Sequence, residues 1–149
     1  VSSLYATNTL QQVGKYALNR FVLNVPWHPL SSTNEFPKEA RTYWQENVDW
    51  KTATSYDATV ALIEALKKQS QPSRTGVQKV LADPNFKVTG ATGTISFNGS
   101  DRKEPINVLL KVVRSNCNDS GYTFLPINYP VATTARLDCP ANPPISTKP

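Results

Sequence analysis

The chain has 149 residues, of which 39% are hydrophobic and 18% are charged, a balance typical of a globular protein rather than a disordered one. No uninterrupted apolar run is long enough to cross a bilayer. The net charge of +5 comes from 16 basic and 11 acidic side chains. The basic side chains are scattered rather than gathered into a stripe, which argues against a nucleic-acid partner.

The first third of the sequence predicts a helix, a strand and an irregular segment. A short helix is expected around Leu10 and Val13. The apolar run over residues 21–25 predicts a buried strand. Proline-rich residues 26–29 should leave regular structure, because a proline biases the preceding residue toward extended geometry.

Three helices are expected next. The first should begin near Pro37 and extend toward Val48, and the second should open at Thr52 or Thr54. Asp57 would lie in the first turn of that second helix as a capping or surface carboxylate, and Asp49 is interpreted in the same way. The expected apolar face of this second helix comprises Tyr56, Ala58, Val60, Ala61, Leu62, Ala65 and Leu66. The third helix is expected over residues 73–82.

The pattern then changes to strands. Residues 90–93 are predicted to form a loop, residues 94–97 a strand, and Asn98–Gly99 a turn. Longer strands are expected at 106–113 and 122–125. Half of the twelve prolines lie from Pro126 onward, which predicts an irregular tail. The layout is α/β, with too few strands for a complete doubly wound sheet.

Cys117 and Cys139 allow two readings. They are either free thiols in a reducing compartment or one disulfide, and we favour the disulfide and an exported location because the segment between them has a modest apolar content. With two cysteines and the single His28, a structural metal site is not expected. Because the sequence begins at Val1 and contains no methionine, we also expect that a preceding segment was removed.

Three motifs resemble one known family. Residues 56–66 are similar to its Y-D-A-x-x-x-L-x-x-A-L helix, residues 90–97 to its G-x-x-G-x-I-x-F strand, and residues 98–102 to its N-x-G-D-R turn, with Ser100 as a departure. The family is that of the type I periplasmic binding proteins, which includes the branched-chain amino-acid-binding proteins and extracellular receptor relatives. The resemblance covers about residues 1–115.

The resemblance implies two Rossmann-like lobes that hold a ligand in the cleft between them. This chain would be the C-terminal part, with incomplete sheets and without the N-terminal half. Residues 1–29 would end the second lobe and cross over, and 30–100 would belong to the first lobe. Residues 101–125 would return to the second lobe, and 126–149 would form the Pro-rich tail.

The resemblance also implies a function. The chain would bind a small polar solute, such as an amino acid, outside the cytoplasm, through Ser2, Ser3, Tyr5, Trp27 and His28. It would serve the permease of an ABC-type transporter or a fused signalling domain. No catalytic residue, cofactor or metal is expected, and no nucleic acid. We further expect dimerisation or strand exchange, because open strand edges and apolar faces favour it.

Two alternatives remain open. The Pro-rich, disulfide-closed tail would suit a protein-interaction module of an exported envelope protein. A small hydrolase is formally possible because His28 is present, but no G-x-S-x-G sequence accompanies it.

Overall fold

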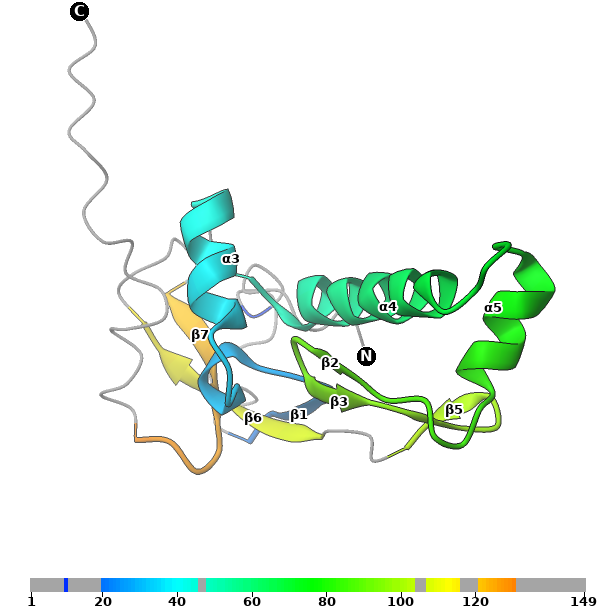
Figure 1. Cartoon of the computed structure of the whole chain (residues 1–149). Helices are drawn as coiled ribbons and strands as arrows, with labels where there is room; N and C mark the ends of the chain where they lie inside the picture. Colours follow the sequence, from blue (N-terminus) through cyan, green and yellow to red (C-terminus); the bar gives the residue numbers. More distant parts are fainter. Residues whose placement is uncertain (1–9, 11–19, 46–47, 104–106, 116–120, 131–149) are drawn as a thin grey trace, which may run out of the picture. The chain divides into compact units, whose positions relative to one another are not determined.

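The computed structural model describes residues 10, 20–45, 48–103, 107–115 and 121–130 (Figure 1). The chain divides into two compact units. One consists of Pro26–Asn107, and the other combines Val1–Val25 with Val108–Pro149. The continuous unit is therefore inserted within the discontinuous one. In the described residues no helix is sufficiently long and apolar to cross a membrane.

The discontinuous unit contains a three-stranded antiparallel sheet in the order β1-β6-β7. Its strands are β1 (Val22–Val25), β6 (Val108–Arg114) and β7 (Tyr122–Pro126). Leu23 of β1 lies opposite Leu110 of β6, and both are buried, whereas their neighbours Val22 and Leu109 are exposed. This alternation is that of strands with one face toward the core. The three strands confirm the sequence prediction with shifts of one or two residues at their ends.

The chain after β7 is held by one ammonium group. Lys111 of β6 donates from Nζ to the carbonyl oxygen atoms of Ile127 and Tyr129, at 3.1 and 2.9 Å. These bonds satisfy carbonyl groups that follow the last strand.

The continuous unit begins with a short 3-10 helix, η2 (Pro29–Ser31), and α3 (Phe36–Trp44). Helix α3 ends before Val48, because Gln45 takes a left-handed backbone conformation with φ of 58°. The predicted extension of this helix to Val48 is therefore wrong.

The long helix α4 (Trp50–Lys67) begins earlier than predicted. Asp49 caps it, since its Oδ1 accepts from the backbone N–H groups of Lys51 and Thr52 at 2.8 and 3.3 Å. The prediction for Asp49 is confirmed, and the predicted start at Thr52 or Thr54 is wrong. The predicted apolar face is also wrong in large part, because Tyr56, Leu62 and Leu66 are exposed. The buried positions of α4 are Ala53, Asp57, Ala61 and Ala65.

Helix α5 (Arg74–Leu81) confirms the third predicted helix, with Ser73 as its N-cap. Two short antiparallel ribbons follow: β2 (Val88–Gly90) pairs with β3 (Gly93–Ile95), and β4 (Phe97–Asn98) pairs with β5 (Asp101–Arg102). The predicted loop over 90–93 is therefore the tight connection of a hairpin. The predicted turn at Asn98–Gly99 is confirmed, with Gly99 at φ of 66°.

Two apolar clusters form the core of this unit. Ala61, Phe86 and Ile95 make one of them, and Trp27, Ala53 and Ala91 make the other. Alanines on α4 contribute to both clusters, because a side chain of one carbon lets the β2–β3 ribbon approach the helix closely. The described residues thus form the expected α/β fold with small sheets.

Candidate functional site

The five predicted ligand contacts fall into two groups. Ser2, Ser3 and Tyr5 lie outside the described residues, as do Cys117 and Cys139, so these assignments stay predictions. Trp27 and His28 lie within the continuous unit, at its N-terminal end.

Trp27 is a core side chain. It is 2% exposed and packs with Ala53 and Ala91. Its ring meets that of Phe36 edge to face, with centroids 5.9 Å apart. Its indole N–H is buried and has no hydrogen-bond partner among the described residues. Trp27 therefore anchors the segment that follows β1.

His28 is also buried, at 3% exposure. Its ring Nδ1 accepts from the N–H of Leu30 at 3.3 Å, and its carbonyl oxygen accepts from the N–H and the hydroxyl of Ser31, both at 2.9 Å. Its backbone is extended, as Pro29 requires. The imidazole thus caps η2 and fixes the turn after Trp27. A role of either residue in ligand contact stays a prediction.

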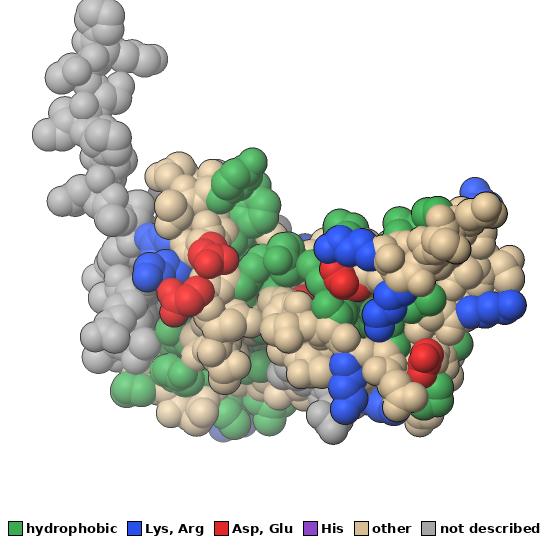
Figure 2. Space-filling view, in the orientation of Figure 1, with side chains coloured by type: hydrophobic (Ala, Val, Ile, Leu, Met, Phe, Trp, Pro, Cys, Tyr) green, Lys and Arg blue, Asp and Glu red, His purple; other side chains and the backbone are tan. Residues whose placement is uncertain are grey.

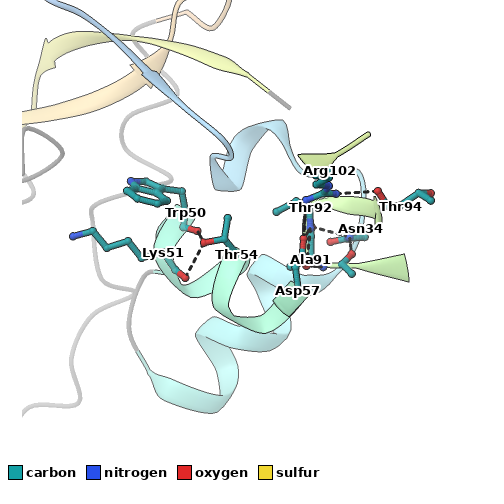
Figure 3. A network of polar contacts seen from close by, with 10 residues as sticks. Asn34, Trp50, Lys51, Thr54, Asp57, Ala91, Thr92, Thr94 and Arg102 are labelled. Carbon is teal, nitrogen blue, oxygen red and sulfur yellow. Dashed lines mark hydrogen bonds and ion pairs between the residues drawn. The ribbon is translucent and has the colours of Figure 1, made fainter. Parts of the chain in front are cut away.

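A buried polar cluster surrounds the connection between β2 and β3 (Figure 3). We define it as Asp57, Ala91, Thr92 and Arg102 and call it the Asp57 cluster. The Asp57 carboxylate is 5% exposed and accepts from the N–H of Ala91 at 2.6 Å and from the N–H of Thr92 at 3.4 Å. It also accepts from the Thr92 hydroxyl. The carboxylate of one helix thereby satisfies both amides of the tight connection.

Arg102 closes the cluster from β5. Its Nη1 lies 3.2 Å from Asp57 Oδ2 and 2.5 Å from the Thr92 hydroxyl, and its Nη2 donates to the Thr94 carbonyl at 2.9 Å. This places a cation beside a buried carboxylate, which is the arrangement that offsets the cost of removing the charge from water. The two ribbons and α4 are therefore joined through one carboxylate.

Asn34 holds the same connection through its carbonyl groups, whereas Asp57 binds its amide groups. Its Nδ2 donates to the carbonyl groups of Gly90 and Ala91 at 3.1 and 3.0 Å, while its Oδ1 accepts from the N–H of Phe36 at 3.1 Å. Gly90 is required where the connection meets α4, since an added Cβ would lie 2.3 Å from Asp57 Oδ1. The amide of Asn34 thus links the start of α3 to the β2–β3 hairpin.

The interpretation of Asp57 as a capping or surface group is wrong. It lies two turns inside α4, on the stripe that Ala53, Ala61 and Ala65 bury at spacings of four. That spacing is the pattern in the sequence that could have placed Asp57 inside. Asn34, Thr92 and Arg102 were also missed as partners, because their contacts join segments far apart in the chain.

The Asp57 cluster has a structural role, because it joins α4 to the β2–β3 connection and to β5. Its carboxylate, hydroxyl and guanidinium groups bond one another, except that the buried Nε of Arg102 has no hydrogen-bond partner among the described residues. Within the described ranges, no group of three or more His, Cys, Asp or Glu could hold a metal ion. The cluster fixes the shape of the unit on which Trp27 and His28 lie.

A comparison with solved structures identifies a protein with a similar fold. The chain is similar to the leucine-binding protein LivK from Thermotoga maritima, with a TM-score of 0.56 and 19% sequence identity. The match covers 79% of this chain and 33% of that one, so the chain spans about a third of the length of its structural neighbour. A scan of known protein families finds no match, and a search of curated proteins finds no relative. The comparison therefore establishes the fold: part of the architecture of a leucine-binding protein.

Proposed function

We propose that the chain is part of an exported binding protein that recognises a small polar solute of the amino-acid class and performs no chemistry on it. The observation that carries the proposal is the likeness to a leucine-binding protein over 79% of the chain. The order of the family-like motifs along residues 56–102 supports it independently.

Such a protein works by a shift between conformations. A ligand that binds one conformation more tightly increases the population of that conformation. A partner that recognises this conformation then binds the protein only when the ligand is present. We propose a membrane permease of the ABC type or a fused signalling domain as that partner. The two units of this chain are joined by two chain segments, at Val25–Pro26 and Asn107–Val108, which supports a hinge between them.

The test is a titration of the full-length binding protein, of which we propose this chain to be part, with the twenty L-amino acids, leucine first, by calorimetry and thermal shift. A ligand at a hundred times its Kd stabilises the folded protein by about 2.7 kcal/mol, which a thermal shift resolves easily. Maltose and a nucleoside serve as chemically unrelated controls. The absence of heat and of thermal shift across the whole amino-acid panel would refute the proposal.

The predicted contacts Ser3 and Tyr5 are tested with the ligand that gives the largest shift. Replacing a hydroxyl that binds ligand removes about one hydrogen bond, so Ser3→Ala and Tyr5→Phe should each weaken binding roughly 2- to 12-fold. Ser70→Ala, on the exposed segment after α4, is the matched control and should leave the Kd unchanged. Equal affinities in all three variants would remove Ser3 and Tyr5 from the site.

A disulfide between Cys117 and Cys139 would be a separate support for the exported location. The two thiols of the purified protein should resist alkylation by iodoacetamide under denaturing conditions and react only after reduction. Full alkylation without reductant would show free thiols and withdraw this support for export.

A further inference from the structure

The turn between β4 and β5 contains the single Asn-Gly pair of the chain, Asn98 and Gly99. Asn98 lies opposite Asp101 in the ribbon, so Gly99 and Ser100 form the connection between the two strands. Asn98, Gly99 and Ser100 are all exposed. Figure 2 shows charged side chains at the surface around the end of the continuous unit where β5 lies in Figure 1. Water therefore has access to the Asn-Gly pair.

The backbone nitrogen of Gly99 has room to react. Gly99 has a φ of 66°, and a Cβ built on it would meet nothing within 4 Å, so open space surrounds this part of the turn. A glycine also lacks the side chain that would hinder the approach of its nitrogen to the side chain of the preceding residue. No hydrogen bond to another described residue fixes the Asn98 side chain. The amide carbon of Asn98 can therefore rotate toward the Gly99 nitrogen.

We propose that Asn98 is a site of spontaneous deamidation. The Gly99 nitrogen loses its proton and attacks Cγ of Asn98, and the new N–Cγ bond closes a succinimide ring. The Cγ–Nδ2 bond breaks, and the amide group leaves with that proton as ammonia. The succinimide then reacts with one water molecule, whose hydroxyl group adds to a ring carbonyl carbon and whose proton returns to the Gly99 nitrogen. Addition at Cγ gives aspartate, and addition at the main-chain carbonyl carbon gives isoaspartate.

Both products disturb the ribbon of β4 and β5. Each has a carboxylate at residue 98, opposite the carboxylate of Asp101, and like charges in directly opposite positions destabilise a strand pair. Isoaspartate also routes the main chain through Cβ and Cγ, which adds one backbone atom to β4. The register in which Phe97 lies opposite Arg102 then no longer fits the turn.

The ribbon connects this turn to the Asp57 cluster. From β5, Arg102 Nη1 lies 3.2 Å from Asp57 Oδ2, and its Nη2 donates to the Thr94 carbonyl at 2.9 Å. From β4, Phe97 stacks on the buried ring of Phe86, with centroids 6.0 Å apart. A displaced β5 weakens the ion pair and leaves the buried carboxylate of Asp57 with less compensation. Deamidation at the surface therefore loosens the interior of the continuous unit.

The first test is mass spectrometry of the purified protein after ageing in a mildly alkaline buffer, which favours loss of the Gly99 proton. Trypsin releases residues 88–102, in which Asn98 is the single side-chain amide, so its conversion is read directly. Methylation by an isoaspartyl methyltransferase identifies the isoaspartate. Asn85 is the internal control, because it is also exposed in a turn but precedes the bulky Phe86. Asn98 should convert at least about tenfold faster than Asn85, a difference of about 1.4 kcal/mol in barrier height.

Two variants test the mechanism of the conversion. Gly99→Ala places a Cβ beside the attacking nitrogen, and Asn98→Gln requires a larger ring. Each should slow the conversion at residue 98 at least about tenfold relative to the wild type. The Asn98→Gln variant keeps Gly99 in its left-handed conformation, so it tests the reaction without a change in the turn.

Hydrogen exchange and urea denaturation test the effect on the Asp57 cluster. The N–H groups of Ala91 and Thr92, which donate to Asp57, should exchange faster after ageing, while those of β6 in the other unit should not change. Asn98→Asp has the new charge without the extra backbone atom. Its urea midpoint should fall by roughly 0.1–1 M, and that of the aged protein should fall further.

Four results would overturn the proposal. Asn98 and Asn85 could convert at equal rates, or Gly99→Ala could convert as fast as the wild type. The exchange of Ala91 and Thr92 could stay unchanged once Asn98 is converted. Equal acceleration of exchange in β6 would show general unfolding in place of a local effect on the Asp57 cluster.

Discussion

Replacing Asp57 by asparagine tests the account of the Asp57 cluster most directly. The amide keeps one acceptor oxygen for the N–H of Ala91, but its NH2 group replaces the oxygen that receives the Thr92 hydroxyl and Arg102. The change therefore removes the ion pair with Arg102 and the hydrogen bond from the Thr92 hydroxyl, and it weakens the hydrogen bond from the Ala91 N–H, whose acceptor is no longer charged. Because Arg102 is about a quarter exposed and can be rehydrated, we expect a loss of about 2–3 kcal/mol of unfolding free energy.

The assay is urea denaturation followed by tryptophan fluorescence. Trp27, Trp44 and Trp50 all lie in the continuous unit, so their emission reports on the unit that contains Asp57. A loss of this size should lower the midpoint by roughly 0.7–3 M urea, at a slope of about 1–3 kcal/mol per M.

Asp49→Asn is the matched control, with the same chemical change on the same helix. Asparagine caps a helix as well as aspartate does, so only the favourable charge at the helix start is lost, about 0.3–1 kcal/mol. Equal midpoints for Asp57→Asn and Asp49→Asn would refute the reasoning, since they would show that burial and the contact with Arg102 add nothing.

Two further changes probe the packing around the cluster, again by urea denaturation. Gly90→Ala should destabilise the unit by about 2–3 kcal/mol, because its Cβ would press on the Asp57 carboxylate and on Ile95, whereas Gly99→Ala faces open space and should cost only about 1 kcal/mol for its positive φ. Phe86→Ala should cost about 3–5 kcal/mol, since the ring is fully buried against Ala61 and Ile95. A Gly90→Ala variant as stable as Gly99→Ala, or a loss below 1 kcal/mol in Phe86→Ala, would contradict the described packing.

The sequence was informative where local chemistry decides the structure. Ser73 caps α5, and Asn98–Gly99 forms a turn, because a capping hydroxyl and a left-handed glycine act over two or three residues. The strand over 21–25 followed from its apolar content. The motifs of residues 56–102 led to the fold that the structural neighbour shows.

The sequence was misleading for α4. Its apolar residues occur on all sides, so periodicity does not choose the buried face. The choice is made by the β2–β3 hairpin, which requires small residues where it packs on the helix and therefore buries Ala53 against Ala91 and Ala61 against Ile95. The burial of Asp57 depends on Thr92 and Arg102, which lie 35 and 45 residues further along the chain.

The insertion of one unit within the other has a consequence for the order in which the chain folds. Residues Pro26–Asn107 are contiguous and can fold as soon as they leave the ribosome, whereas β1 must wait for β6. The pairing of β1 with β6 starts at Val25 and Val108, the residues that flank the inserted unit. Once that unit has folded, its ends hold these residues together, and the entropy of closing the long intervening loop has already been lost. Damage to the Asp57 cluster should therefore delay formation of a sheet to which the cluster does not belong.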